Sequence, residues 1–316
     1  MMLLELPSTF RRPDSNDAGE EIEIASDWLE ASVLFSGEAV TAPTVTDLLV
    51  ESQWFQAQPD ARAFVDEVWS RIRARHIACG SCGPFTFGYQ SIELKVASWE
   101  EAPAHAYCLL LSYARHNLKW ARLKSIKWNY NIQGDIFEKM TCNALEQLLP
   151  TWTVYRTGWS ATETAQLGEV VEEIARRLCG EVKNLKRWNK QQAKEEGLDV
   201  LCYRGFADGR GNFPAFFVQC ASGRGFKQKL KDPDLGVWND LVSLVPASLP
   251  RKGFVTPFTF PQRQFEQYAI RSKGLLLDRC RLLSAEATKP DWLDAKAAGQ
   301  IRKWAKPLIK KLPWPQ

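Results

Sequence analysis

The sequence predicts an α/β fold, in which helices flank a central mixed sheet, and two observations support that prediction. Two β-rich apolar runs at residues 198–203 and 213–220 are separated by a turn-forming cluster at 208–212. Stretches whose apolar residues have helical spacing precede and follow these runs. Strands that alternate with helices along a chain favour a sheet whose faces the helices cover.

Residues 1–130 are expected to form a mostly helical accessory region that regulates the rest of the chain. The polar stretch 7–23 predicts a loose N-terminal arm that contributes little to the core. Apolar residues between positions 24 and 76 have the spacing of three amphipathic helices. An extended strand or a hairpin is expected at 85–96 and a further helix at 100–115.

Residues 131–290 are expected to form the core domain. In chain order, we expect a helix at 134–149, a strand at 152–156, a helix at 160–178, the hairpin at 198–220, a helix at 237–244, and strands at 253–258 and 275–282. Asp135 stands near the start of the first helix and Pro150 stops it. Ser160 and Glu163 form a capping-box pattern that is typical of a helix start.

The net charge of +4 is small, but the basic residues are clustered. One run contains Lys183, Lys186, Arg187, Lys190 and Lys194, and we expect it to contact the phosphate backbone of a polyanionic substrate, since cations that neutralise phosphates release counterions. A solvated helix face is the alternative interpretation of such a run. Residues 291–316 are expected to form a basic amphipathic tail, for which nucleic acid, an anionic surface and a partner helix all stay open.

The sequence also indicates where the protein is located. The eight cysteines, several of them inside apolar runs, do not have the spacing of a disulfide framework. The first residues lack the basic segment of a signal peptide, and the longest apolar stretch, at 104–114, is too short to cross a bilayer. We therefore expect a soluble cytoplasmic protein that has no membrane contact.

Three oxygen-bearing side chains are candidates for a metal site. Asp199 begins the first strand of the expected hairpin, Gln219 stands twenty residues later near the end of the second, and Glu138 lies on the helix at 134–149. Mg²⁺ and Mn²⁺ prefer oxygen ligands, and phosphodiester hydrolysis uses such cations. The two carboxylates, the Gln219 amide oxygen and the Cys220 carbonyl are therefore the expected ligands.

The order of these elements, with Gly197-Leu198-Asp199-Val200 on one strand and Phe217-Val218-Gln219-Cys220-Ala221 on the next, resembles the PD-(D/E)XK nuclease superfamily. The resemblance implies a restriction-endonuclease-like core in which Glu138, Asp199 and Gln219 bind the metal. The signature of that family has a lysine where this chain has Ala221. We expect Arg224 or Lys227, which follow in the chain, to supply that cation.

The leading hypothesis is a divalent-metal-dependent DNA endonuclease, similar to uncharacterised bacterial proteins of anti-phage defence loci and acting as an effector subunit. The N-terminal region is then expected to restrain the nuclease or to dock it on a sensor, helicase or ATPase. The first alternative is a degenerate member of the fold that binds nucleic acid or a partner protein without cleavage. A purely structural component is the second alternative. The sequence does not indicate an oligomeric state.

Overall fold

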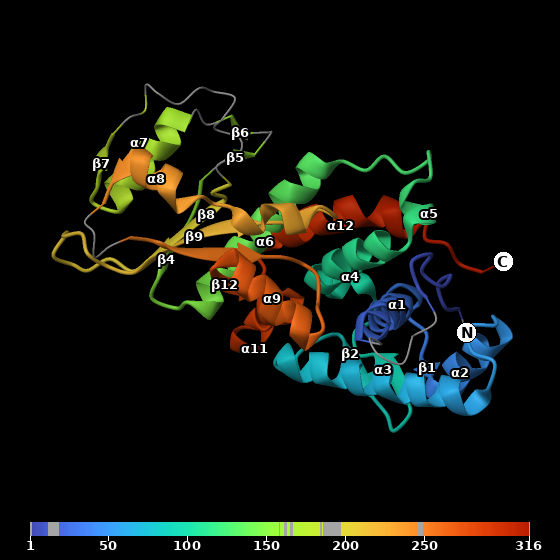
Figure 1. The fold of residues 1–316 in the computed structure, drawn as a ribbon. Coiled ribbons are helices and arrows are strands. Elements are labelled where there is room, and N and C mark those ends of the chain that lie inside the picture. Colours follow the sequence, from blue (N-terminus) through green and yellow to red (C-terminus); the bar gives the residue numbers. More distant parts are fainter. Residues whose placement is uncertain are drawn as a thin grey trace. The chain divides into compact units, whose positions relative to one another are not determined.

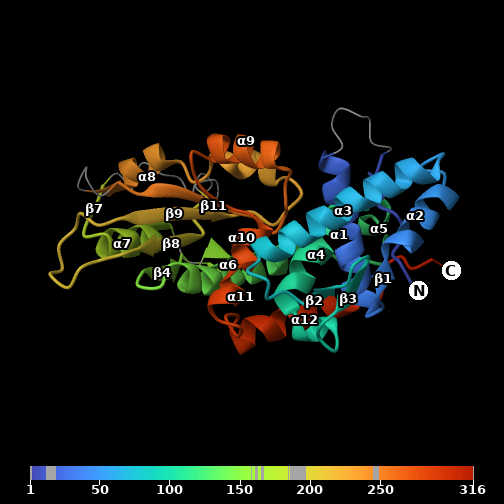
Figure 2. The same cartoon turned by 90° about the horizontal axis from the view of Figure 1, so that it is seen from below.

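The computed structural model describes residues 2–11, 19–157, 159–160, 163–164, 167–183, 185, 197–244 and 249–315. The chain divides into two compact units (Figures 1 and 2). Unit 1 comprises Met1–Trp128, Pro257–Gln262 and Arg279–Gln316, and unit 2 comprises Asn129–Thr256 and Arg263–Asp278. Residues 279–316, which the sequence analysis divides between the core and a tail, thus belong to the same unit as the N-terminal helices.

Unit 1 is mostly helical. Its main elements are α1 (Gly19–Ser36), α2 (Ala42–Glu51), α3 (Gln58–Ala78), α4 (Pro103–His116), α5 (Leu118–Ala121), α10 (Arg279–Leu283), α11 (Ala285–Thr288) and α12 (Ala295–Ile309), with a short 3-10 helix η1 (Trp99–Glu101). A small antiparallel sheet contains β1 (Val40–Thr41), β2 (Phe85–Phe87) and β3 (Ser91–Leu94) in the order β1-β3-β2. The three helices expected between residues 24 and 76 and the hairpin expected at 85–96 are confirmed.

The N-terminal arm is a correction to the sequence analysis. Phe10 of the expected arm is almost fully buried in the core of unit 1, and α1 already begins at Gly19, within the stretch expected to be loose. Residues 12–18 of the arm lie outside the described residues. The Thr9 hydroxyl donates a hydrogen bond to the His116 carbonyl at 2.9 Å, which fixes the described part of the arm against the end of α4. The arm therefore contributes apolar contacts to the core, although its polar residues made the stretch look loose.

Unit 2 contains a five-stranded mixed sheet in the order β12-β11-β9-β8-β4. The strands are β4 (Thr153–Arg156), β8 (Val200–Tyr203), β9 (Ala215–Cys220), β11 (Arg251–Val255) and β12 (Gly274–Leu277). The strands β4, β8 and β9 pair antiparallel, whereas β9, β11 and β12 run parallel. The expected mixed sheet and the hairpin of β8 and β9 are therefore confirmed.

Helices cover both sides of this sheet (Figure 2). They are α6 (Tyr130–Leu148), α7 (Leu167–Arg177), α8 (Leu235–Leu241), α9 (Gln262–Ser272) and the 3-10 helix η4 (Phe226–Lys231). Apolar residues of α7 and α8 form one cluster with Leu201 and Phe217 of the hairpin, which are fully buried. Two short antiparallel ladders complete the unit: β5 (Trp159–Ser160) pairs with β6 (Glu163–Thr164), and β7 (Glu181–Val182) pairs with β10 (Val242–Ser243).

Several predicted boundaries in unit 2 were wrong. Ser160 and Glu163 do not cap a helix, because they pair with each other in the β5–β6 ladder, and α7 begins only at Leu167. The helix expected at 134–149 begins earlier, at Tyr130. Asn129 caps it, since its side chain accepts hydrogen bonds from the backbone of the first helical turn. The expected strand at 275–282 ends at Leu277, and α10 follows from Arg279.

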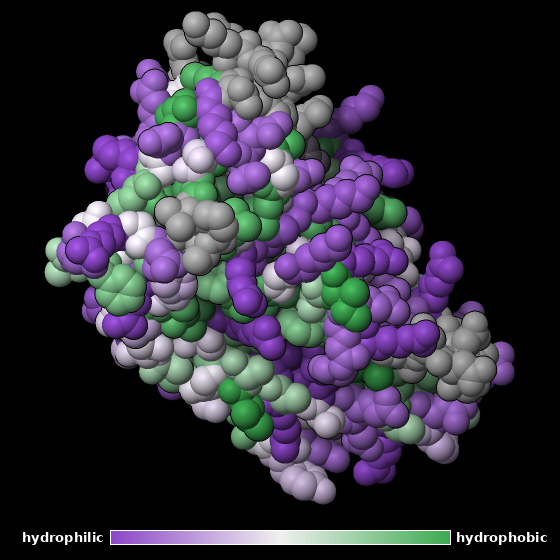
Figure 3. Space-filling view, turned by 60° about the vertical axis from the view of Figure 1, so that its left-hand side comes forward, coloured by the Kyte–Doolittle hydropathy of each residue, from purple (hydrophilic) through white to green (hydrophobic). Residues whose placement is uncertain are grey.

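The surface offers little contiguous apolar area in the view of Figure 3, where hydrophilic side chains cover most of the face and apolar residues form small patches. Within the described ranges, no helix combines the length and the apolar character that crossing a membrane requires.

Candidate active site

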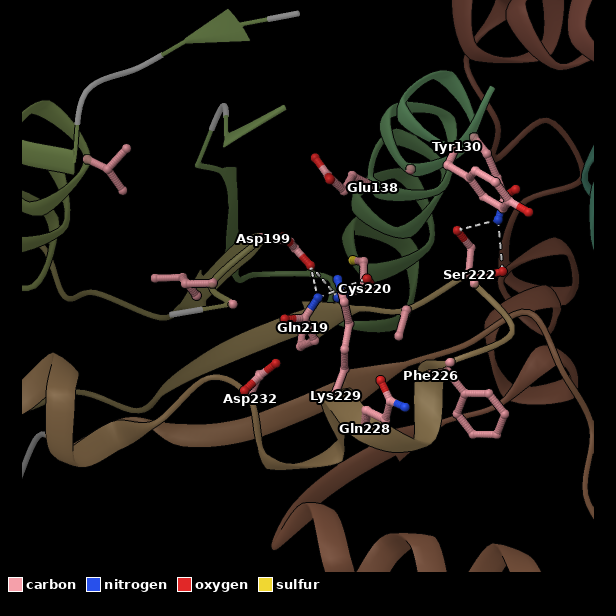
Figure 4. Close-up of a pocket in the computed structure, with 18 of the residues that line it drawn as sticks. Tyr130, Glu138, Asp199, Gln219, Cys220, Ser222, Phe226, Gln228, Lys229 and Asp232 are labelled. Carbon is pink, nitrogen blue, oxygen red and sulfur yellow. Dashed lines mark hydrogen bonds between the residues drawn. The ribbon is translucent and has the colours of Figure 1, made fainter. Parts of the chain in front are cut away.

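A cavity of about 850 Å³ in unit 2 brings together the candidate metal ligands of the sequence analysis. Glu138 reaches it from α6, Asp199 from the start of β8, and Gln219 from β9 (Figure 4). Lys229 of η4 and Asp232, the residue that follows η4, also line it. Side chains distant in the sequence thus converge on one space at the end of the β8–β9 hairpin.

The register of the hairpin brings Asp199 and Gln219 together. Val200 pairs with Val218 in the antiparallel ladder, and the Asp199 amide continues that ladder with a hydrogen bond to the Val218 carbonyl at 3.0 Å. Continuing the register by one residue places Asp199 opposite Gln219. The Asp199 carboxylate oxygen Oδ2 accepts hydrogen bonds from Gln219 Nε2 at 2.5 Å and from the Cys220 amide at 2.6 Å.

Gln219 turns its amide nitrogen, and not its oxygen, toward Asp199. The nitrogen also donates to the Cys220 carbonyl at 2.9 Å. The amide oxygen Oε1 is buried and accepts no hydrogen bond from any residue that the structure describes. In this orientation, the oxygen that the sequence analysis assigns to a shared cation points away from Asp199.

Glu138 is held by a neighbouring cation. Arg156 of β4 donates from Nε to Glu138 Oε2 at 2.9 Å, and its Nη2 donates to Asp135 Oδ1 at 2.7 Å. Burial raises the pKa of Glu138, and the charge of Arg156 opposes that rise. Arg156 therefore helps to keep the Glu138 carboxylate ionised and fixes its orientation.

Asp199 lies in surroundings that disfavour its charged form. Burial, followed by the negative charge of Glu138, raises the pKa of Asp199 to about 8, whereas the hydrogen bond from the Cys220 amide and the charge of Lys229 act in the opposite direction. Two carboxylates that face one cavity repel each other unless a cation lies between them. A bound cation would therefore favour the ionised form of both groups.

Lys229 is a site residue that the sequence analysis missed. Its positive charge lowers the pKa of both Asp199 and Glu138, and its side chain extends toward Asp199 and Cys220 in Figure 4. The available signal was the spacing of η4, in which Phe226 and Leu230 are buried while the lysines between them are exposed. That spacing does not specify which lysine turns toward the sheet.

The two cations that the sequence analysis names instead do not line the cavity, as far as the structure describes it. Lys227 places its Nζ 5.6 Å from the centroid of the Tyr268 ring, and Arg224 is exposed. Ala221, where the resemblance in the sequence led us to expect a lysine, is buried and carries no charge. The structure therefore points to Lys229 as a cation that lines the cavity together with the candidate carboxylates.

The basic run is described only in part. Lys183 is exposed, and its Nζ donates to the Asn239 carbonyl at 3.3 Å. The expected backbone contacts of Lys186, Arg187, Lys190 and Lys194 lie outside the described residues.

The donor set of the cavity suits a hard cation. Two carboxylates, the Cys220 carbonyl and the orphaned Gln219 oxygen are the kinds of ligand that Mg²⁺ and Mn²⁺ take. Within the described part of the chain, no three His, Cys, Asp or Glu side chains are arranged as a metal site. Any cation here would thus rely on the amide and carbonyl oxygens, on water and on substrate.

Compared with protein-family models, curated proteins and solved structures, the chain matches none of them.

Proposed function

We propose that unit 2 is a restriction-endonuclease-like nuclease core, and that its cavity hydrolyses phosphodiester bonds of DNA with Mg²⁺ or Mn²⁺. The observation that carries the proposal is the convergence of Glu138, Asp199, Gln219 and Lys229, from four elements, on one polar cavity of about 850 Å³. A carboxylate pair beside a lysine is a combination that phosphodiester hydrolysis can use.

The residues have distinct roles in this proposal. A bound divalent cation would polarise the phosphate and lower the pKa of a coordinated water. Asp199 and Glu138 would hold that cation, and the Cys220 carbonyl lies beside them. The Lys229 ammonium group would stabilise negative charge that develops on the phosphate. Arg156 would act as a positioning residue, because it orients Glu138 without lining the cavity.

Cellular role and partners are part of the same proposal. The basic residues of unit 2, including Lys183, would contact the DNA backbone without reading its sequence. Unit 1 would restrain the nuclease or dock it on a helicase, an ATPase or a sensor, as an effector subunit of an anti-phage defence system requires. The separate compactness of unit 1 supports an independent role for it.

A second candidate function is binding of nucleic acid or a protein partner without cleavage. The observation that favours it is the buried Ala221 at the position where a lysine is expected. Arg156 already neutralises Glu138 through an ion pair. In a protein that only binds its partner, the cavity would then need no metal ion.

Cleavage of plasmid DNA in Mg²⁺ or Mn²⁺ tests the proposal. We expect Asp199→Ala to abolish cleavage and Lys229→Met to lower its rate by about 10²–10³-fold, the range for losing one stabilising group. Lys231→Met, on the same 3-10 helix but outside the cavity lining, is the matched control and should retain the wild-type rate. The sequence analysis expects Lys227 to stabilise the phosphate, whereas the structure points to Lys229. Lys229→Met should therefore lower the cleavage rate more than Lys227→Met does.

Two results of the same cleavage assay would contradict the proposal. Wild-type protein that binds DNA yet leaves it intact with every divalent cation, both alone and with a candidate ATPase partner, would establish the non-cleaving alternative. Cleavage that survives Asp199→Ala would place the catalytic centre elsewhere in the chain.

A further inference from the structure

Two buried thiols of unit 1 lie in contact with each other. Cys79 caps the end of α3, Cys280 lies on α10, and the two residues are 8% and 6% exposed. Both are free cysteines, and their side chains share a hydrogen bond. All of unit 2 lies between them in the sequence. Two thiols in direct contact are the arrangement from which a disulfide forms.

Tight packing holds the two cysteines at the same place. Gly80 follows Cys79, and a Cβ atom on it would lie only 2.2 Å from the Cβ of Ala287 on α11. The turn after α3 therefore packs directly against the segment that follows Cys280. Gly80 has a φ of +79°, a left-handed conformation that glycine adopts without strain. The contact between the thiols is thus set by the fold of unit 1.

Two guanidinium groups beside the pair have unused donors. Arg75 and Arg279 line a small cavity of about 20 Å³ together with both cysteines. The Nε of Arg75 and the Nη1 of Arg279 are buried and find no acceptor among the residues that the structure describes. A cavity of this size holds about one water molecule, and an oxygen atom there would satisfy such donors. The site can therefore hold a small oxygen-bearing group next to two thiols.

The same surroundings keep the pair reduced until an oxidant arrives. The hydrogen bond to Cys280, followed by burial, raises the pKa of Cys79 well above its usual range, whereas the positive charge of Arg279 opposes that rise. A protonated, buried thiol reacts slowly, so only a small oxidant that enters as the fold opens locally should reach it. Disulfides that form in this way inside cells are usually transient and responsive to oxidants.

We propose that Cys79 and Cys280 are an oxidative modification site, at which hydrogen peroxide converts the thiol pair into a disulfide. The peroxide transfers one oxygen atom to one sulfur, which gives a sulfenic acid and a water molecule. The second sulfur then attacks the first, the S–S bond forms, and the oxygen leaves as another water molecule. Two thiols and one peroxide thus give one disulfide and two water molecules, and the two electrons that the sulfurs lose reduce the O–O bond.

The disulfide would tie the returning segment of the chain to the N-terminal helices. It would join α10, the first element after unit 2, to α3, and so close a covalent loop that contains all of unit 2. A disulfide that closes a long loop removes much conformational freedom from the unfolded chain. Oxidation should therefore stabilise unit 1. The inference concerns unit 1 alone and does not depend on the proposed function of unit 2.

Peptide mapping of the full chain tests the site. After treatment with hydrogen peroxide, alkylation and digestion without a reductant, we expect mass spectrometry to find peptides joined through Cys79 and Cys280. Cys280→Ala should abolish these joined peptides. Cys108→Ala removes another buried thiol of unit 1 that does not line the small cavity, and this matched control should still form the bond.

Thermal unfolding tests the consequence for stability. Peroxide treatment should raise the midpoint of unfolding of the wild-type chain by about 5–10 °C, and dithiothreitol should reverse the rise. Cys280→Ala, shown by circular dichroism to be folded, should show no rise. Cys108→Ala should show the same rise as wild type.

Three results would overturn the inference. Cys79 and Cys280 that are both still alkylated in treated wild-type chain, a result that needs no variant, would mean that the pair is not oxidised. Joined peptides that contain Cys82 or Cys108 in place of one member would assign the site to other thiols. An unchanged midpoint in fully cross-linked chain would mean that the bond does not stabilise unit 1.

Discussion

Asp199 illustrates at the scale of one residue how a buried carboxylate makes stability depend on pH. Its carboxylate is buried beside Glu138, and its pKa is raised to about 8 by that burial and by the neighbouring negative charge. The ordinary value for an aspartate is 3.8, so the folded protein binds more protons than the unfolded chain between these two values. The free energy of unfolding contributed by Asp199 therefore falls as the pH rises from about 4 to 8. Strain of this kind is typical of sites that bind a charged ligand.

The variant Asp199→Asn should remove this penalty, because an amide oxygen can accept the hydrogen bonds from Gln219 and Cys220 without a charge. In the presence of a chelator, we expect the variant to be as stable as wild type near pH 4 and more stable by a few kcal/mol near pH 8. Urea denaturation across this pH range measures the difference. A difference in the free energy of unfolding that does not grow with pH would show that ionising Asp199 does not destabilise the folded protein. Added Mg²⁺ should narrow the gap by stabilising wild type.

At the scale of elements, helix α1 carries a buried acidic face. Glu23, Asp27 and Glu30 recur at intervals of four and three residues, so they lie on one side of the helix. Arg75 of α3 forms ion pairs with all three, and Arg279 of α10 with Asp27 and Glu30. Burial alone would raise the pKa of Asp27, but the two guanidinium groups lower it well below its usual range.

Removing one member of this cluster should destabilise unit 1 strongly. Arg75→Met would leave buried carboxylates without their shared cation, and we expect it to lower the free energy of unfolding by about 3–5 kcal/mol. Arg62→Ala, an exposed position on the same helix, should change it by less than about 0.5 kcal/mol. Chemical denaturation followed by tryptophan fluorescence gives both values. Equal effects of the two variants would mean that the cluster does not stabilise the fold.

At the scale of the whole molecule, the chain returns to its first unit after building the second. Residues 279–316 add α10, α11 and α12 to the N-terminal helices, and Arg279 reaches Asp27 across some 250 positions of sequence. Trp120 of α5 donates its indole hydrogen to the Lys311 carbonyl at 2.7 Å. Unit 1 is therefore completed only by the C-terminal segment.

A fragment that ends at residue 128 should not fold cooperatively. It would keep Asp27 and Glu30 buried without Arg279, and it would expose the face of α4 on which α12 packs. We expect weak near-ultraviolet circular dichroism and no sharp thermal transition for this fragment. Joining residues 279–316 to it through a Gly/Ser linker should restore both signals. A sharp transition in the short fragment would show that unit 1 needs only its N-terminal part.

The sequence alone determined the local elements whose patterns are strong. The apolar runs and the turn cluster predicted the hairpin of β8 and β9, and helical periods predicted α1 to α3 and α6, because these patterns depend on neighbours in the chain. The same approach failed at Ser160 and Glu163, where a capping pattern lies in a pair of short strands, and at residues 279–282, where the end of the expected strand is a helix.

Only the tertiary structure decided which side chains meet. The sequence singled out Glu138, Asp199 and Gln219 by their chemistry, but it could not show that Lys229 and Asp232 line the same cavity while Arg224 and Lys227 do not. It also gave no sign that the Gln219 amide turns its nitrogen toward Asp199. A side-chain direction depends on the register of strands and the turn of a 3-10 helix brought together by the fold. That information lies in contacts between distant residues, whereas sequence patterns report mainly on near ones.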